Sequence, residues 1–374
     1  MPIVRNRATG QLIATALAGS WRDSSCSFTL SADELATIAP IVIKSAAGAL
    51  LWWRIRQCEL AQSESGAQLQ TLYRLHRLEA RVHAHKIKTI LRAFNAAGIE
   101  GVLMKGWSVA RLYPEPGLRH YSDLDVCVVP NQYRAARNAL RSLGALESYV
   151  DLHRGLGRHE KSSWPELFEH SEVVELDGLP IRVLGPEDHL RLLCLHWLRH
   201  GAWGPLGLCD VACAIERRPA SFDWARCLGS NIKRADWIAC TLGLAHQLLG
   251  AQVDGTPVAD RARELPHWLI PAVLEQWETC INPNYRDIAL AEVTPLLHTP
   301  RRLLQEAAAR WRHPIRATVE VRGSFNDWPR GPYQLAALLL RSHELPRQIA
   351  MMLWRQVRTM VRGEAIRRVQ ISDL

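Results

Sequence analysis

The sequence lacks any low-complexity tract and any uninterrupted apolar run long enough to cross a bilayer. The first absence excludes a disordered or fibrous chain. With 48% hydrophobic residues over 374 positions, the sequence predicts a globular protein with room for two or three domains. The apolar stretch from Leu35 to Trp53 is interrupted by Pro40 and Lys44, so it predicts a buried helix, and no membrane partner is expected.

The sequence also lacks a C-x-x-C pair and a signal sequence. Its nine cysteines are odd in number and lie mostly in apolar patterns, which predicts reduced, buried thiols in a cytoplasmic protein. Cys209 and Cys213 are four residues apart on a predicted helix, but without a regular zinc spacing core packing is favoured over a metal site shared with His196 or His200. The apolar stretch from Leu12 to Ala18 is too short for a signal peptide, so no export is expected.

A concentrated basic stripe is missing as well. The net charge of +9 and the pI near 9.3 suit a polyanionic partner or a phosphate-rich substrate. However, the basic residues are spread along the chain in short pairs such as Arg217-Arg218 and Arg301-Arg302. Nucleic acid therefore stays open as a partner but is not favoured.

The hydrophobic periodicity divides the chain into three predicted parts. Residues 1–66 form an N-terminal helical lead-in, of which residues 1–30 are expected to be loosely ordered. Residues 67–185 contain the predicted strands, and residues 186–374 form a helical C-terminal region. The predicted helices cover Gln68–Ala97, Asn131–Leu143, Asp188–His200, Gly207–Glu216, Phe222–Gly229, Ala235–Leu249, Pro271–Cys280, Leu303–Trp311, Leu335–Ser342 and Leu345–Val361.

The predicted strands are few and short. They cover Gly101–Met104, Ser122–Val129, Leu146–His153, Val173–Leu176 and Ile181–Leu184. Asp177-Gly178 between the last two is a strong hairpin signal, and residues 155–171 are predicted to be a polar loop. The fold class expected is α+β, with a small sheet embedded in a mostly helical protein.

The chemistry concentrates between Gly101 and Val129. Lys105-Gly106 ends the first strand, and a short helix predicted from Trp107 to Tyr113 would place backbone N–H groups near Gly106, where an anion is favoured. On the next strand Asp123 and Asp125 are two apart, so both side chains are expected on one face, opposite Leu124, Val126 and Val128.

Two carboxylates on one strand face favour a hard divalent cation such as Mg²⁺. An isolated D-x-D pair is more often a pair of solvated residues, but aspartate is disfavoured in strands and the flanking residues are apolar enough to be core. Arg119 and Ser122 supply donors for phosphate. Asp151, on the next predicted strand, completes the metal site if the two strands are neighbours; a turn residue at a strand end is an equally good interpretation.

Three further polar residues gather in the helical region. His196 and His200 are four apart and share a helix face, and Asp210 follows after a Gly- and Pro-containing turn. They are interpreted as a polar cluster beside the site, with their roles left open.

Several separate motifs resemble an uncharacterised bacterial nucleotidyltransferase family of the DNA polymerase beta-like nucleotidyltransferase superfamily. The motifs are VLMKGWSVARLYPEPGLRHYSDLDVCV at residues 102–128, VDLH at 150–153, the stretch 179–184 leading into PEDHL, LCLHWLRH at 193–200 and CDVA at 209–212. The resemblance covers roughly residues 70–250. It differs from the wider superfamily at the turn, where Gly-Ser or Gly-Gly is usual and this chain has Gly106-Trp107 with Ser108 one place later.

The resemblance implies a short mixed sheet with helices packed on it and transfer of a nucleoside monophosphate from ATP or another NTP, with Mg²⁺ or Mn²⁺ as cofactor. Asp123 and Asp125 would be metal ligands and Asp151 the third carboxylate, which binds a second ion or accepts the proton of an acceptor hydroxyl. The turn residues Lys105, Gly106 and Ser108, with Arg119 and Ser122, would lie near the triphosphate.

The acceptor is not identified by the sequence, and a small molecule or a peptide is favoured. Three alternatives stay open: a toxin-like nucleotidyltransferase that modifies tRNA or a protein, a glycosyltransferase that uses its D-x-D pair to hold the metal of a nucleotide-sugar, and a non-enzymatic basic protein that binds nucleic acid.

Overall fold

The computed structural model describes residues 8–23, 30–155, 163–278, 311 and 313–341. The chain forms two compact units, one of residues 1–280 with 324–327 and one of residues 281–323 with 328–374. The described helices of the second unit are α15 (Pro314–Glu320) and a helix over residues 331–341. The predicted helix over Leu345–Val361 lies outside the described residues, as does the one over Leu303–Trp311 except for Trp311.

A five-stranded mixed sheet is the centre of the first unit, in the order β3-β2-β1-β5-β4. Its strands are β1 (Gly101–Leu103), β2 (Leu124–Val128), β3 (Val150–Arg154), β4 (Glu172–Leu176) and β5 (Leu179–Val183). β2 is parallel to β3 and antiparallel to β1, while β1 is parallel to β5. Together with the many helices around it, this sheet confirms the predicted α+β class.

The hairpin predicted at Asp177-Gly178 is present, since β4 and β5 pair antiparallel around it. Both turn residues have positive φ angles, 46° and 80°, as a two-residue turn that follows the sheet twist requires.

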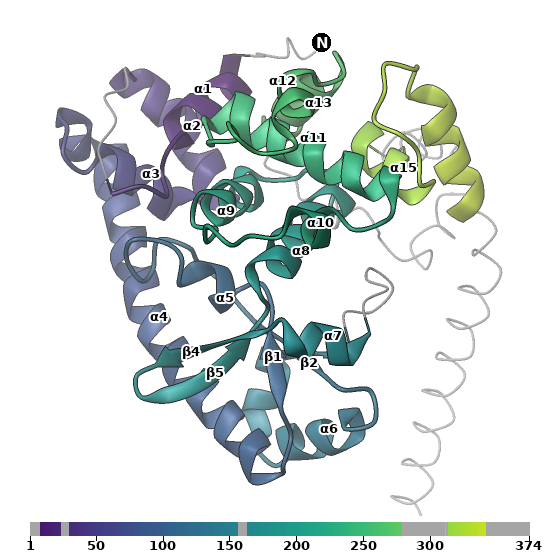
Figure 1. The fold of residues 1–374 in the computed structure, drawn as a ribbon. Helices are drawn as coiled ribbons and strands as arrows, with labels where there is room; N and C mark the ends of the chain where they lie inside the picture. The colour runs from purple at the N-terminus through teal and green to yellow at the C-terminus, as the bar shows by residue number, and fades with distance from the viewer. Residues whose placement is uncertain (1–7, 24–29, 156–162, 279–310, 312, 342–374) are drawn as a thin grey trace, which may run out of the picture. The chain divides into compact units, whose positions relative to one another are not determined.

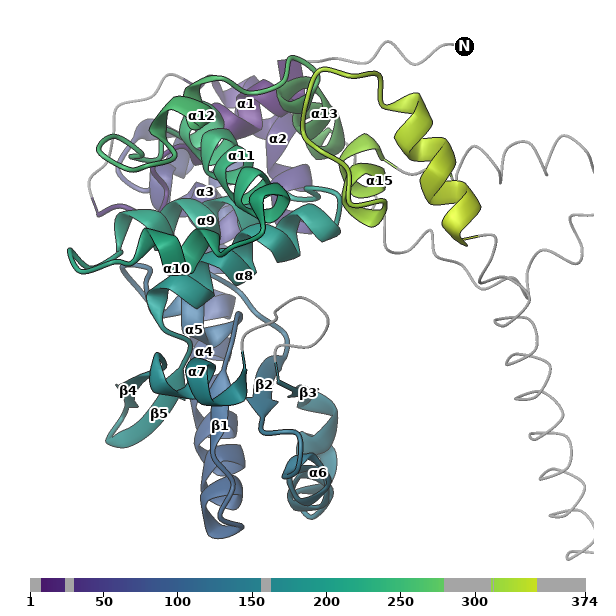
Figure 2. The ribbon, with the colours of Figure 1, turned by 45° about the vertical axis from the view of Figure 1, so that its right-hand side comes forward.

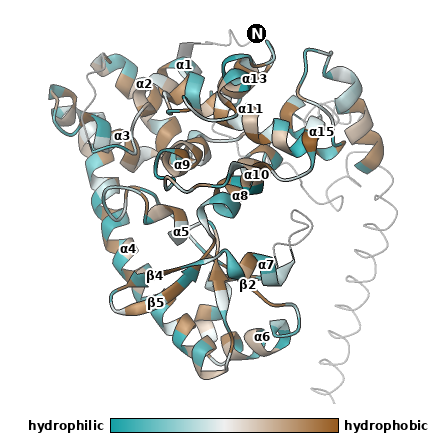
Figure 3. Ribbon diagram, in the orientation of Figure 1, coloured by the Kyte–Doolittle hydropathy of each residue, from teal (hydrophilic) through white to brown (hydrophobic). Residues whose placement is uncertain are grey.

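Helices cover both faces of the sheet (Figures 1 and 2). α4 (Glu64–Ala96) is 33 residues long; its second half packs with α6 (Tyr133–Arg141) against one face through Ile87, Ile90 and Phe94. Hydrophilic and hydrophobic residues are interleaved along α4 (Figure 3), as expected for a helix with one buried side. The other face contacts Leu167, Leu184 and Leu192.

The other helices of the first unit form a layer that α8, α9 and α11 hold together. They are α1 (Ala8–Leu17), α2 (Ala32–Lys44), α3 (Gly48–Ile55), α8 (Pro186–Arg199), α9 (Pro205–Glu216), α10 (Trp224–Leu228), α11 (Ile232–Leu249), α12 (Ala259–Arg263) and α13 (Leu269–Trp277). Short connections add α5 (Trp107–Ala110), η1 (Glu59–Gln62) and η2 (Gly144–Tyr149). No helix among the described residues has both the length and the apolar character needed to cross a membrane.

The loose order predicted for residues 1–30 is wrong where α1 forms. Ile13 and Leu17 on this helix are completely buried, and α1 packs against α2, α3, α9, α11 and α13. Ile13 and Leu17 are four residues apart and lie on one helix face. Packing against five helices therefore stabilises a segment whose own apolar pattern is short. The predicted helix from Leu35 to Trp53 is two helices, α2 and α3, because the chain turns at Ala46, where φ is 61°.

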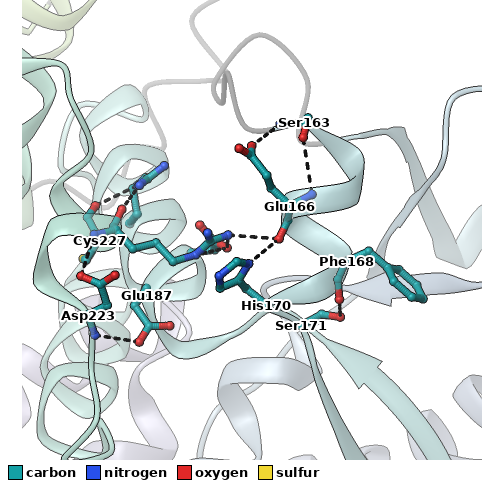
Figure 4. Close-up of polar contacts among 11 residues, drawn as sticks. Ser163, Glu166, Phe168, His170, Ser171, Glu187, Asp223 and Cys227 are labelled. Carbon is teal, nitrogen blue, oxygen red and sulfur yellow. Dashed lines mark hydrogen bonds and ion pairs between the residues drawn. The ribbon is translucent and has the colours of Figure 1, made fainter.

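The predicted loop over residues 155–171 is wrong at α7 (Trp164–Glu169). The Ser163 hydroxyl accepts a hydrogen bond from the Glu166 N–H, and the Glu166 carboxylate accepts one from the Ser163 N–H (Figure 4). This capping box satisfies backbone donors at the helix start. The same view shows the Glu187 carboxylate accepting from the Asp223 N–H, which ties α10 to α8.

The third strand is shorter than predicted. Residues 144–149 form the 3₁₀ helix η2, and β3 begins only at Val150. A 3₁₀ helix repeats every three residues, so Leu146 and Tyr149 both reach the core from it, which a strand would not allow.

Candidate active site

A backbone hydrogen bond joins the turn after β1 to the segment that carries Asp123 and Asp125. The Met104 N–H donates to the Asp125 carbonyl at 3.1 Å, and the Ser108 N–H donates to the Lys105 carbonyl at 2.8 Å. Gly106 has φ 48° and ψ −114°, and a Cβ atom there would lie 3.3 Å from the Asp123 carbonyl oxygen. Glycine is therefore needed at this turn for its backbone angles and for the close approach.

The strand pairing predicted for Asp151 is present. Asp125 on β2 and Asp151 on β3 are partners in the parallel ladder, so their side chains leave the sheet side by side. Leu124, Val126 and Val128 lie in the core cluster on the opposite face. The alternation expected along this strand is therefore observed, although Asp123 itself lies just before β2.

Asp125 is the buried centre of the polar cluster. Its Oδ1 lies 2.7 Å from Lys105 Nζ and 3.2 Å from His153 Nε2, and the Asp125 side chain is only 7% exposed. Burial on its own would raise the pKa of Asp125, but the hydrogen bond from His153 and the charge of Lys105 outweigh it and lower the pKa to about 2. Asp125 is therefore ionised at neutral pH.

The pKa of Asp123, unlike that of Asp125, is raised. Desolvation of its carboxyl group and the negative charges of Asp125 and Asp151 raise the pKa of Asp123, while Lys105 opposes them. The carboxyl groups of Asp123, Asp125 and Asp151 thus repel one another beside the N-terminal end of β2. An added cation relieves this repulsion.

His153 joins the cluster and was not singled out by the sequence. Its Nε2 lies 3.1 Å from Asp151 Oδ2 as well as 3.2 Å from Asp125 Oδ1. Asp125, Asp151 and His153 each offer a ligand atom, and these atoms lie within 4.8 Å of one another. His153 is two residues after Asp151 on the same strand, so strand alternation placed it on the same face and was the available signal.

Arg119 forms its side-chain ion pair with Asp210, which is not part of the carboxylate cluster. Its Nε and Nη2 donate to both oxygens of Asp210 on α9, at 2.8 to 3.2 Å, and the Tyr113 hydroxyl donates to the same carboxylate at 2.9 Å. Asp210 is 2% exposed, so this is a buried ion pair with two parallel hydrogen bonds. Asp210 thereby anchors the segment that leads to Asp123.

The two serines near the turn differ in exposure. Ser108 is completely buried, and its hydroxyl has no hydrogen-bond partner within the described part of the chain. Ser122 is exposed beside Asp123.

His196 on α8 faces the cluster from the helical layer. Burial lowers its pKa well below the usual value, and the positive charges of Lys105 and His200 act in the same direction. The rings of His196 and His200 are 4.4 Å apart between centroids. His196 is therefore a neutral imidazole within the electrostatic reach of Lys105 and Asp125.

A family model described as uncharacterised nucleotidyltransferase matches residues 35–250, which is more than half of the chain. The chain belongs to this family. The match contains every motif on which the resemblance rested and begins earlier than expected, within α2. The family makes the protein a nucleotidyltransferase with an NTP as substrate, as the sequence predicted.

Two other comparisons add little. The chain is similar to a solved structure described as an antigenic nucleotidyltransferase-like protein from Paracoccidioides brasiliensis, with 16% identity over 45% of this chain and 93% of that chain and a TM-score of 0.32. No curated protein matches the chain significantly.

Proposed function

We propose that this nucleotidyltransferase transfers a nucleoside monophosphate from ATP or another NTP to a small-molecule or peptide acceptor, with Mg²⁺ or Mn²⁺ as cofactor. The observation that carries the proposal is the pairing of Asp125 with Asp151 across two parallel strands, beside Lys105 and Asp123. We further propose that the protein belongs to the DNA polymerase beta-like superfamily, that residues 67–185 are its catalytic core, and that it acts in the cytoplasm. The free thiols of the seven described cysteines are consistent with that compartment.

The donor set fits a hard divalent cation. Asp123, Asp125 and Asp151 would hold it, because carboxylate oxygens are its preferred ligands. Desolvation, together with repulsion from the other two carboxylates, raises the pKa of Asp123, and a bound cation would offset both effects. His153 would be an additional ligand, better suited to Mn²⁺ than to Mg²⁺. When bound, such an ion neutralises charge on the triphosphate and orients the α-phosphorus.

The residues of the chain have separate roles in this scheme. Lys105 keeps Asp125 ionised and supplies positive charge for the triphosphate, together with the Gly106 turn and Ser122. The Asp151 carboxylate, 58% exposed, takes the proton of the acceptor hydroxyl. The hydroxyl oxygen then forms the bond to the α-phosphorus, and the bond between the α-phosphorus and pyrophosphate breaks. Arg119 and Ser108, both largely buried, support the segments that carry these groups.

The test uses the full chain, NTPs labelled at the α-phosphate, and a panel of small-molecule and peptide acceptors with Mg²⁺ or Mn²⁺. Labelled acceptor and released pyrophosphate are expected, with a loss of at least ~100-fold in Asp125→Asn and Asp151→Asn. Asp260→Asn is the matched control, because this side chain is fully exposed on α12.

Two results would contradict the proposal. One is full turnover in Asp125→Asn. The other is transfer of sugar from labelled nucleotide-sugars without any transfer from NTPs, which would identify a glycosyltransferase. Salt-sensitive RNA binding that survives both substitutions, without NTP turnover, would favour the nucleic-acid-binding alternative.

A further inference from the structure

A second cluster of ligand-type side chains lies between α4 and the segment that precedes β2. His76 and Glu79 are three residues apart on α4, and His120 comes three residues before Asp123. One ligand atom from each lies within 4.8 Å of the other two. None of the three belongs to the Asp125 cluster.

His76 provides the observation that points to a ligand. The residue is only 7% exposed, and its Nδ1 has no hydrogen-bond partner within the described part of the chain. A buried polar atom without a partner has lost its hydration without gaining a hydrogen bond in return. Buried polar groups normally have partners, so an orphaned imidazole nitrogen beside a second imidazole and a carboxylate indicates a missing binding partner.

The protonation of the two histidines suits metal ligation, because a metal needs the lone pair of a neutral imidazole. Burial and the neighbouring His120 lower the pKa of His76 to about 4, and burial also lowers the pKa of His120. Glu79 supplies the negative charge.

The rings of His76 and His120 are stacked, with 4.4 Å between centroids and 20° between planes, so one ring must turn for both to bind the same ion. The spacing of His120 and Glu79 already agrees with a tetrahedral ion. His120 Nδ1 lies 3.3 Å from Glu79 Oε2. Two ligands ~2.0–2.1 Å from a tetrahedral Zn²⁺ are about 3.3 Å apart. Arg119, whose positive charge acts on His120, is paired with Asp210 at 2.8 Å.

We propose that His76, Glu79 and His120 bind a divalent transition metal of the Zn²⁺ class. Two imidazole nitrogens and one carboxylate oxygen suit Zn²⁺, Co²⁺ or Mn²⁺, whereas Mg²⁺ prefers an all-oxygen shell. The ion joins α4 to the segment that carries Arg119 and Asp123. It therefore stabilises the backbone beside the active site without taking part in the reaction.

The experiment separates this site from the Asp125 cluster. Metal-stripped full-length Asp125→Asn protein is titrated with Zn²⁺ alone in competition with a chromogenic chelator, and the visible absorption of added Co²⁺ is recorded. One ion per chain is expected to bind. Glu79→Gln and His120→Asn, added to Asp125→Asn, are expected to weaken it at least ~10-fold and to abolish the Co²⁺ spectrum.

A histidine outside the cluster provides the control for this titration. His85→Asn changes an exposed histidine of the same helix and is expected to leave Zn²⁺ binding unchanged. Glu79 and His120 are partly exposed, so their variants are expected to fold, and circular dichroism checks this. Equal Zn²⁺ affinity and stoichiometry in all these variants would overturn the proposal and would identify an ordinary imidazole–carboxylate contact. Because nucleotidyl transfer is not the readout, failure here is distinct from failure of the proposed function.

Discussion

Asp125 and Asp151 are direct partners across the parallel ladder of β2 and β3. Side chains at partner positions leave the same face of a sheet, so the two carboxylates converge although 26 residues of sequence separate them. His153, one strand alternation beyond Asp151, contacts both. This arrangement gives the first prediction.

His153→Gln is predicted to change the metal preference of the enzyme. Loss of the imidazole ligand is expected to weaken activation by Mn²⁺ about 10-fold or more, while activation by Mg²⁺ changes less because Mg²⁺ depends on the carboxylates. The measurement is NTP turnover as a function of each metal after chelator treatment. Equal losses with both metals would assign His153 to orientation of the carboxylates instead of to ligation.

Arg119→Lys is predicted to destabilise the protein by about 2–4 kcal/mol, because lysine cannot reproduce the parallel hydrogen bonds from Nε and Nη2 to the two oxygens of the buried Asp210. Urea unfolding followed by tryptophan fluorescence measures the change. Arg137→Lys, at an exposed position on α6, is the control and should stay within ~0.5 kcal/mol of wild type. A raised KM for NTP at unchanged stability would instead assign Arg119 to the triphosphate.

Gly106→Ala is predicted to reduce both stability and turnover. A Cβ atom there is strained by φ 48° and lies 3.3 Å from the Asp123 carbonyl oxygen, so the free energy of unfolding should fall by about 1–3 kcal/mol. Gly98→Ala is the matched control: φ is 67° and nothing lies within 4 Å of the added Cβ. Its cost should be about 1 kcal/mol without loss of turnover. The two variants are compared by thermal unfolding and by nucleotidyl transfer, and equal turnover in both would contradict the prediction.

His189 is predicted to make the fold sensitive to acid. Burial, followed by the charges of Arg111 and Arg119, lowers its pKa to about 3. Between about pH 6.5 and pH 3 the unfolded chain binds a proton at this residue that the folded chain does not, so stability falls as the pH falls through this window. From about pH 7 to pH 5 the loss due to His189 is about 2 kcal/mol.

His189→Gln should remove that part of the pH dependence, measured as urea unfolding at the two pH values. The exposed His85 serves as control, because its replacement by Gln should leave the pH dependence as in wild type. An identical pH dependence in His189→Gln and wild type would contradict the prediction, because it would show that the pKa of His189 is the same in the folded and the unfolded chain.

The centre of the site could be predicted from the sequence because its signals are local. The apolar run before Lys105-Gly106, the alternation around Asp125 and the Asp177-Gly178 turn depend on neighbouring residues only, and β1, β2 and the hairpin formed where these signals predicted them. Asp151 required one further step, the pairing of two strands.

The features that the sequence did not predict depend on contacts between residues far apart in the chain. The apolar pattern of α1 is too short to be recognised alone, and the helix is stabilised by packing against five other helices. The partner of Arg119 is 91 residues away on α9. The sequence placed Asp210 in a polar cluster with His196 and His200, but it gave no signal that Asp210 pairs with Arg119. The orphaned Nδ1 of His76 is likewise a property of packing and has no signature along the chain.

The Arg119–Asp210 pair also has a consequence for biosynthesis. At roughly 5–20 residues per second, translation would complete Asp210 about 5–20 s after Arg119. Until α9 has left the ribosome, the Arg119 guanidinium lacks the Asp210 carboxylate with which it is buried in the folded chain. The nascent segment that leads to Asp123 therefore stays hydrated and is not yet held in place. The candidate active site of a growing chain is therefore assembled late, only after α9, which follows it in the sequence, has been made.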